Sequence, residues 1–168
     1  MLAELPSPKV FKGDSPGGMS CKFVVVDGVG LKLFRHDGER NRSLATQSAL
    51  NCMGMAPEPG PKFDIELDHK MMYGHATEVA ETVVDMTTKH GRIASAYEAF
   101  VAKYTDADEK QRVNNEMQAT MSRLFKLGCR WCDDHPGNFG WIDGHMVILD
   151  AMGVRFPFNP HIDGEICV

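Results

Sequence analysis

The sequence contains no run of apolar residues that approaches the length of a membrane-spanning helix. Residues 1–6 show neither a basic region nor the start of an apolar stretch of signal-peptide length. No block of Lys or Arg is present, and the net charge is −5. We therefore expect a cytoplasmic protein, in the host cytoplasm if a virus encodes it. We expect no membrane and no nucleic-acid partner, because a phosphate backbone calls for a basic face.

The five cysteines are an odd number and are unevenly spaced, at positions 21, 52, 129, 132 and 167. This usage predicts reduced thiols rather than a disulfide framework. Cys129, Cys132 and His135 have a spacing that fits a zinc site, and this interpretation stays open. A closed structural site needs four ligands, and Cys167 is the only cysteine that follows this cluster.

The 168 residues, with 43% apolar and 24% charged side chains, are enough for one domain or for two small lobes that share a cleft. The first half reads as a small antiparallel sheet with one helix. Strands are expected at 9–12, 21–26 and 29–34, the helix at 38–53, and further strands at 63–67 and 71–79. Asp27-Gly28 predicts a hairpin turn.

From about residue 80 the pattern becomes helical. One predicted helical face carries Ile93, Tyr97, Phe100, Val101 and Tyr104. A polar break at 105–108 predicts the cap of a long helix that ends near Gly128, with a buried stripe of Val113, Met117, Met121 and Leu124. A hairpin at 140–149 and an irregular tail complete an α+β chain.

A polar loop and the acid that follows the hairpin carry the strongest chemical signal. Asp133, Asn138 and Asp150 form an Asp-x4-Asn-x11-Asp pattern. It offers a carboxylate base and two oxygen donors for a hard cation, as magnesium-assisted phosphoryl transfer needs. Taken alone, residues 133–138 are also typical of a solvated turn. The loop and Asp150 flank the two ends of the hairpin, which predicts that they converge.

A lysine and a set of glycines add weaker signals nearer the amino end. Strand alternation puts Lys32 on the opposite face from Leu31 and Leu33. In isolation such a lysine is most simply solvent-facing. Glycines at 13, 17 and 18 are typical of a plain turn, and equally of a loop whose backbone N–H groups approach phosphates.

Together these residues resemble the protein-kinase-like superfamily, over roughly residues 9–153. The closest similarity is to the atypical and small-molecule kinases whose catalytic loop reads Asp-x-His-x-x-Asn. The segment Asp133-Asp134-His135-Pro136-Gly137-Asn138 resembles the Asp-Leu-His-Pro-Gly-Asn loop of coenzyme-Q-associated kinase-like proteins. The compact length is similar to that of small bacteriophage-encoded kinases.

The resemblance implies a role for each matching position. Asp133 would be the catalytic base, Asn138 and Asp150 would bind magnesium, and Lys32 would contact the α- and β-phosphates of ATP. Residues 150–153 would stand for the Asp-Phe-Gly element. The other implied nucleotide contacts lie in the phosphate loop and in the hinge at 77–79, at Gly13, Gly17, Gly18, Glu78 and Val79.

Three departures from the family pattern are visible. The helix interior, residues 41–53, contains no acid to pair with Lys32; Gln47 is best placed to meet it, and Glu39 lies too early. Trp131 stands where the family's His-x-Asp loop has its His. The part after Asp150 is too short for an activation segment and for the helices that carry a peptide substrate.

The resulting expectation is a two-lobed, protein-kinase-like α+β fold with a truncated C-lobe. The N-lobe would span 1–77 and the C-lobe 78–168, with ATP and Mg²⁺ between them. The expected activity is phosphotransfer to a hydroxyl of an unknown acceptor, with Ser or Thr of a protein as one candidate. The alternatives are a catalytically silent kinase-like protein that binds a partner, and nucleotidyl transfer on the same fold. A homodimer or a partner would complete the short C-lobe.

Overall fold

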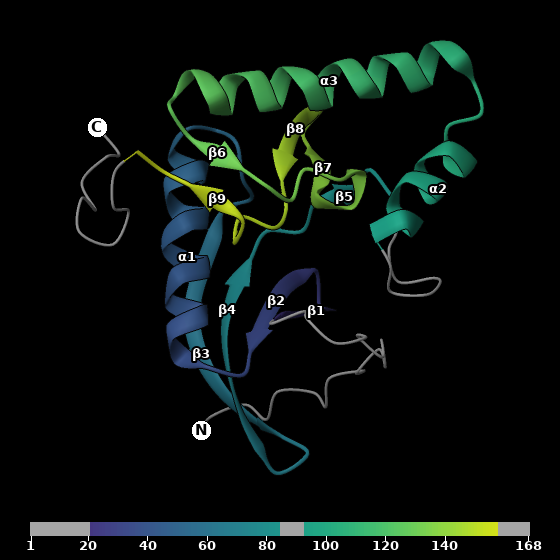
Figure 1. Ribbon diagram of the computed structural model, residues 1–168. Helices are drawn as coiled ribbons and strands as arrows, with labels where there is room; N and C mark the ends of the chain where they lie inside the picture. The colour runs from purple at the N-terminus through teal and green to yellow at the C-terminus, as the bar shows by residue number, and fades with distance from the viewer. Residues whose placement is uncertain (1–20, 85–92, 158–168) are drawn as a thin grey trace.

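The computed structural model describes residues 21–84 and 93–157. Its first part is an antiparallel sheet of four strands in the order β1-β2-β4-β3. The strands are β1 (Cys21–Val26), β2 (Val29–Phe34), β3 (Pro59–Leu67) and β4 (Lys70–Thr77). One helix, α1 (Asp37–Cys52), packs along this sheet and contacts β2, β3 and β4 (Figure 1). The helix and the strands expected from residue 21 onward are confirmed, with shifts of a few residues at their ends, and the strand expected at 9–12 lies outside the described residues.

Two tight hairpins have the same turn chemistry. Asp27 and Gly28 join β1 to β2, and Asp143 and Gly144 join β7 (Phe139–Ile142) to β8 (His145–Ile148). All four residues have positive φ, at 49° and 81° in the first turn and 48° and 77° in the second. Positive φ at both central positions is what a two-residue hairpin with the usual strand twist requires, which explains the Asp-Gly pairs.

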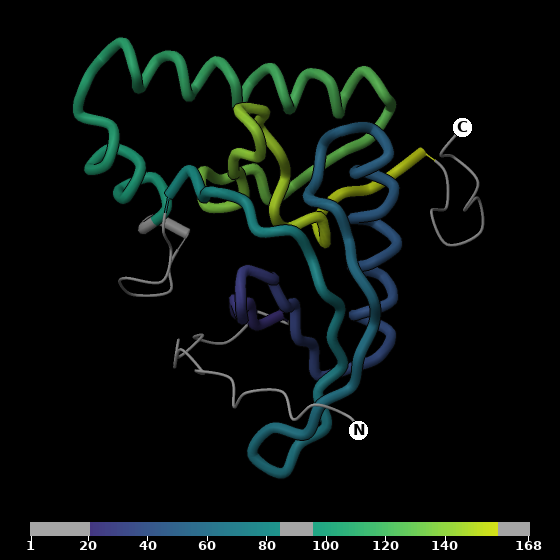
Figure 2. The backbone as a smooth tube through the Cα atoms, turned by 180° about the vertical axis from the view of Figure 1, so that it is seen from behind, coloured from purple at the N-terminus to yellow at the C-terminus, as the bar shows by residue number. Residues whose placement is uncertain are grey.

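The second part of the chain surrounds a smaller sheet of order β5-β7-β8, in which β5 (Glu81–Thr82) pairs with β7. The helices are α2 (Ile93–Lys103) and α3 (Ala107–Lys126), and a 3-10 turn, η1 (Pro136–Asn138), precedes β7. Seen from both sides, α3 lies across the end of the molecule opposite the β3–β4 turn (Figures 1 and 2). The molecule is an α+β protein.

The long helix α3 begins and packs as predicted. The Asp106 carboxylate accepts a hydrogen bond from the Glu109 amide at 2.8 Å and caps the helix. The predicted stripe is buried, and it joins one apolar core with residues of α1 and of the β7–β8 hairpin. The members of the stripe are Val113, Met117, Met121 and Leu124.

Two local predictions after residue 80 are wrong, and one predicted helical face is only partly buried. Residues 81–82 form strand β5 rather than a helix, because they pair with β7. Phe100 and Tyr104 are buried, but Tyr97 and Val101 are half exposed, so α2 buries a narrower face than its apolar pattern suggests. The tail is not wholly irregular, since β9 (Val154–Arg155) pairs with β6 (Arg130–Trp131).

The cysteines differ in part from the expectation of reduced thiols. Cys21, Cys129 and Cys132 are free, but Cys52 is in a disulfide. The prediction was wrong for Cys52 because a disulfide depends on Cβ atoms meeting in space, which chain spacing does not reveal.

Among the helices of residues 21–84 and 93–157, none combines the length and apolarity needed to cross a membrane.

A histidine is fully buried between the sheet and α1. His75 of β4 lies 3.2 Å from the Ser43 hydroxyl through Nε2, and its Nδ1 lies 2.9 Å from the Ala76 carbonyl oxygen. A carbonyl only accepts, so Nδ1 carries the ring proton and the Ser43 hydroxyl donates to Nε2. Burial lowers the pKa of His75 to about 4, and the charges of Lys32 and Arg40 act in the same direction.

This buried ring makes the stability of the protein depend on pH. The unfolded chain, with a histidine pKa near 6.5, binds more protons than the folded chain between about pH 4 and 6.5. The stabilisation is therefore complete above pH 6.5 and is lost as the pH falls to 4, by about 3 kcal/mol in total. In urea unfolding from pH 4 to 7, we expect His75→Gln to flatten this decline. The exposed His145→Gln should keep the wild-type slope; equal slopes in all three proteins would contradict the prediction.

Candidate functional site

Lys32 lies at the junction of the two parts of the chain. Its side chain projects from β2, is only 9% exposed, and donates from Nζ to Gln47 Oε1 at 2.8 Å and to the Leu149 carbonyl oxygen at 2.7 Å. The interpretation of Lys32 as solvent-facing is therefore wrong, because α1 and the residue after β8 cover this face of the sheet. Burial lowers the pKa of Lys32, and the nearby Asp150 carboxylate opposes that shift.

Gln47 occupies the place in α1 that the sequence suggested. Its amide oxygen accepts from Lys32, while its amide nitrogen donates to the Pro57 carbonyl oxygen at 2.9 Å and to Thr77 Oγ1 at 2.6 Å. The side chain is 1% exposed. A glutamate here would match Lys32 but would have no hydrogen to offer Pro57, so the neutral amide satisfies the site where an acid would not.

Glu39 does not replace the missing acid at Lys32. It lies in the first turn of α1, and its Oε2 is buried without a hydrogen-bond partner in the part of the chain that the structure describes. Its charge acts on Cys21, as do those of Lys32 and Asp150, so the Cys21 thiol lies within reach of the same site. Burial raises the pKa of this thiol to about 12. Sequence reasoning did not assign Cys21 to the site. Its position was readable in principle, because Cys21 is two residues from Phe23 on the same face of β1, and Phe23 pairs with Lys32 of β2.

The polar loop after β6 is organised around the backbone of Asp133. The Asn138 amide nitrogen donates to the Asp133 carbonyl oxygen at 2.8 Å, and the Asn138 backbone N–H donates to the His135 carbonyl oxygen at 2.9 Å. Asn138 is 8% exposed, whereas the Asp133 carboxylate is 43% exposed and lies 3.5 Å from His135 Nε2. The loop is therefore a hydrogen-bonded structure, with Asn138 buried and the Asp133 carboxylate partly exposed, rather than a fully solvated turn.

The β7–β8 hairpin brings Asp150 to this loop, as predicted. The Leu149 N–H donates to the Asn138 carbonyl oxygen at 2.9 Å, so residue 150 follows directly after a bond to the loop. The Asp150 carboxylate accepts from the Met152 N–H at 3.0 Å through one oxygen. Lys32, Asn138 and Asp150 thus come together although they are far apart in the sequence.

Gly153 permits the close packing of the segment after Asp150 against the loop. A Cβ at this position would lie 3.2 Å from Trp131 Cδ1 and 3.3 Å from Asp133 Cβ. Trp131 packs edge-on against Phe139 with ring centroids 5.2 Å apart. Trp131 therefore fixes the start of the loop through its apolar contact with Phe139. Its indole nitrogen is buried and has no hydrogen-bond partner among the described residues.

The predicted nucleotide contacts are only partly placed. Gly13, Gly17 and Gly18 lie outside the described residues. Glu78 and Val79 follow β4 and are exposed. The Glu78 N–H donates to the Glu58 carbonyl oxygen at 2.9 Å. The adenine contact expected from the backbone of residues 77–79 stays a prediction. Thr77 was expected only as part of the hinge, yet its hydroxyl contacts Gln47.

The site carries oxygen donors of the types that magnesium binds. The Asn138 amide nitrogen is held by Asp133, which directs the amide oxygen away from that bond, and Asp150 has a second carboxylate oxygen outside its turn. Amide and carboxylate oxygens are ligands that Mg²⁺ prefers, with phosphates and water as the others. No group of three or more His, Cys, Asp and Glu side chains in residues 21–84 and 93–157 is arranged to hold a metal.

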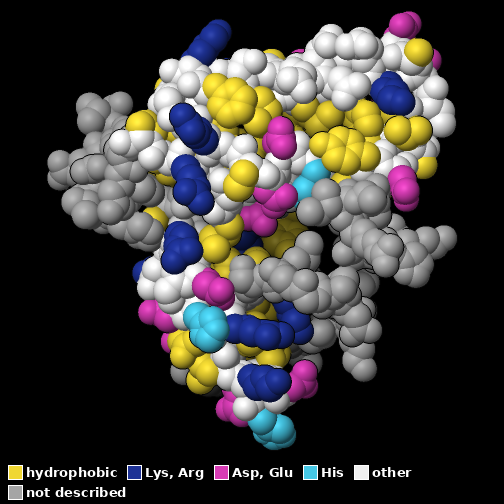
Figure 3. Space-filling view, viewed as in Figure 1, with side chains coloured by type: hydrophobic (Ala, Val, Ile, Leu, Met, Phe, Trp, Pro, Cys, Tyr) yellow, Lys and Arg dark blue, Asp and Glu magenta, His cyan; other side chains and the backbone are white. Residues whose placement is uncertain are grey.

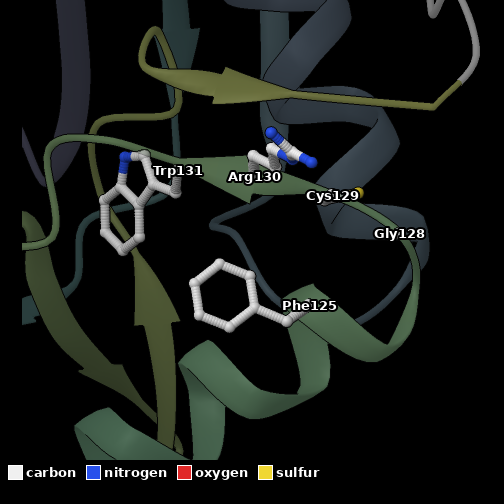
Figure 4. Close-up of a pocket in the computed structure, with 5 residues that line it drawn as sticks. All are labelled: Phe125, Gly128, Cys129, Arg130 and Trp131. Carbon is white, nitrogen blue, oxygen red and sulfur yellow. The ribbon is translucent and has the colours of Figure 1, made fainter.

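The structure of the described residues does not support the zinc site suggested for Cys129, Cys132 and His135. Cys129 is buried, with burial raising the pKa of its thiol, whereas Cys132 is exposed with its sulfur 3.7 Å from the Gly153 carbonyl oxygen. Cys129 instead lines a pocket at the end of α3 together with Phe125, Gly128, Arg130 and Trp131 (Figure 4). In Figure 4 Phe125 lies between the indole ring and Gly128, and Arg130 points to the other side of β6.

The space-filling view shows a hollow between the four-stranded sheet and the helical end of the molecule (Figure 3). Acidic side chains border it on the helical side, and a basic side chain is visible inside.

Comparisons of the chain with protein-family models, with curated proteins and with solved structures found no match.

The packing of Gly153 predicts a measurable loss of stability on substitution. Gly153→Ala places a methyl group against Trp131 and Asp133 at 3.2–3.3 Å, so the neighbours must move. We expect the free energy of unfolding to fall by about 1 kcal/mol. Gly38→Ala is the matched control, because a Cβ there meets nothing within 4 Å and alanine favours the first turn of α1. Equal stabilities of the two variants would contradict this account of the loop.

The hydrogen bonds of Gln47 predict that introducing an acid at this position is destabilising. Gln47→Glu gives Lys32 a carboxylate but leaves the Pro57 carbonyl oxygen without its donor. We expect a loss of about 1–3 kcal/mol in chemical denaturation at pH 7. Gln111→Glu makes the same change on the exposed face of α3 and should be near neutral. A Gln47→Glu protein more stable than wild type would mean that the new ion pair outweighs the lost donor.

Proposed function

We propose that this protein is an ATP- and magnesium-dependent phosphotransferase that acts on a hydroxyl acceptor. The hydroxyl of a Ser or Thr in another protein is one acceptor class that fits. The observation that carries the proposal is the bond from Lys32 Nζ to the Leu149 carbonyl oxygen at 2.7 Å. It joins two positions 117 residues apart and sets a buried cation beside Asp150, and thus beside the Asn138 and Asp133 loop.

The architecture supports the same proposal. The resemblance implies a small antiparallel sheet with one helix for the ATP-binding lobe, and strands β1–β4 with α1 have this form. It also implies a mostly helical part that carries a loop and a hairpin, as α2, α3 and β7–β8 do. Completion of the short second part by another copy or a partner stays a prediction.

Each residue has a defined task in the proposed reaction. Asp133, held through its backbone by Asn138, presents a carboxylate that accepts the proton of the acceptor hydroxyl as the oxygen attacks the γ-phosphorus. Lys32 supplies a fixed positive charge for the phosphates. Asn138 and Asp150 would hold the magnesium ion, which when bound neutralises phosphate charge. The bond between the γ-phosphorus and the bridging oxygen breaks, and ADP leaves.

The second candidate is a kinase-like protein that binds a nucleotide or a partner without transfer. Gln47 favours it, because a neutral amide bonded to Pro57 and Thr77 holds Lys32 where an acid would otherwise hold it. Phosphate positioning then depends on Lys32 exchanging its present partners for phosphate oxygens. Nucleotide binding with no turnover of any acceptor would be the result expected of this candidate.

Nucleotide binding and turnover test the proposal together. A ligand at about 100 times its Kd adds about 2.7 kcal/mol of stability, or about 5–10 °C in Tm for a chain of this size. We expect this rise only with ATP and Mg²⁺ together, and a smaller one in Asp150→Ala. Asp133→Ala should keep the rise but lose release of γ-phosphate, by about 100-fold or more.

Asp134→Ala is the matched control, since Asp134 is the exposed acid next to Asp133. It should keep both the thermal shift and the turnover. Unchanged turnover in Asp133→Ala would exclude the mechanism. No thermal shift with any nucleotide would exclude the proposed function itself.

A further inference from the structure

The two ring nitrogens of His135 have different partners in the polar loop. Nδ1 accepts a hydrogen bond from the Gly137 N–H at 3.1 Å and so caps the turn η1. Nε2 lies 3.5 Å from Asp133 Oδ1. The His135 side chain is 11% exposed, and the backbone carbonyl oxygen of His135 accepts from the Asn138 N–H. One histidine therefore connects the turn to the carboxylate.

These partners determine which nitrogen carries the proton of the neutral ring. A nitrogen that accepts from a backbone N–H has no hydrogen of its own, so the proton of the neutral ring lies on Nε2. That N–H faces the Asp133 carboxylate, which only accepts when ionised. The separation of 3.5 Å is longer than a formed hydrogen bond, and contacts of this kind commonly shorten when the substrate is bound.

We propose that His135 is a positioning residue, whose Nε2–H holds Asp133 Oδ1 so that the other carboxylate oxygen faces the acceptor hydroxyl. This inference rests on the proposed function. Asn138 fixes only the backbone of Asp133, through its carbonyl oxygen. Rotation of the half-exposed carboxylate about its side-chain bonds needs a second restraint, and His135 is placed to supply it.

The two nitrogens can be separated by substitution. In His135→Asn the amide oxygen takes the place of Nδ1 and keeps the bond to Gly137, but the side chain is too short to reach Asp133. In His135→Gln the amide nitrogen takes the place of Nε2 and reaches Asp133, but the acceptor for Gly137 is lost. A structural role and a positioning role therefore predict opposite orders for the two variants.

The experiment measures Tm together with kcat and KM for magnesium-dependent release of γ-phosphate from ATP, with water as the acceptor. We expect His135→Asn to be the more stable variant and His135→Gln the more active one. The kcat of His135→Asn should fall about tenfold or more, with its KM for ATP within about twofold of wild type. The exposed His145→Asn should match the wild-type protein in every measurement.

A spectroscopic measurement tests the contact without turnover. In the full-length protein, nitrogen-15 NMR of the histidine side chains distinguishes the two neutral tautomers. We expect His135 to carry its proton on Nε2, and Asp133→Ala to shift that resonance. A proton on Nδ1, or no shift in Asp133→Ala, would overturn the contact.

The outcomes separate this inference from the proposed function. Turnover by wild type with His135→Asn at least as active as His135→Gln would overturn the positioning role and leave the phosphotransferase proposal standing. No turnover by wild type would overturn both, even if the tautomer is the expected one. The inference is supported if His135→Asn has the higher Tm, His135→Gln has the higher kcat, and the His135 proton lies on Nε2.

Discussion

The arrangement of the site depends on the buried ammonium group of Lys32. A charge removed from water is costly unless it is hydrogen-bonded, and its two partners among the described residues are neutral oxygens, from Gln47 and from the Leu149 main chain. One partner belongs to α1 and the other to the end of the β7–β8 hairpin. The requirement to satisfy one cation therefore holds the sheet, the helix and the hairpin in a single arrangement. Asp150 adds an attractive charge that opposes the lowering of the Lys32 pKa.

The identity of residue 47 follows from the same constraint. Gln47 must accept from Lys32 and donate to Pro57, and among side chains of this length only an amide has both an acceptor and a donor at its tip. The amide that the sequence shows at position 47, where we looked for an acid, thus has partners at both its oxygen and its nitrogen. Among residues 21–84 and 93–157, no carboxylate makes a direct contact with Lys32.

Local patterns predicted much of the fold, and their limits have physical causes. The Asp-Gly turns, the strands around Lys32 and the capped helix α3 depend on neighbours within a few residues, so the sequence showed them. The short strands β5 and β9 form because distant segments pair with them. Each has two residues, which are too few to show the alternation of apolar and polar side chains that predicts a strand. The same limit explains why the sequence did not show the exposure of Tyr97 and Val101, which depends on what packs against α2.

The site shows the same division between local and distant information. Asp133, Asn138 and Asp150 were recognisable because loop chemistry and hairpin geometry fix them within 18 residues of one another. The partners of Lys32 were harder to predict. Gln47 was found from its position in the helix, but the second partner is the backbone carbonyl oxygen of Leu149, and the residue type carries no signal for a backbone contact. Gly153 is the intermediate case, since a glycine after Asp150 is visible in the sequence, while its reason, the contact with Trp131 and Asp133, exists only in three dimensions. Side-chain chemistry is therefore readable from the sequence, whereas the backbone contacts that position it emerge only with the fold.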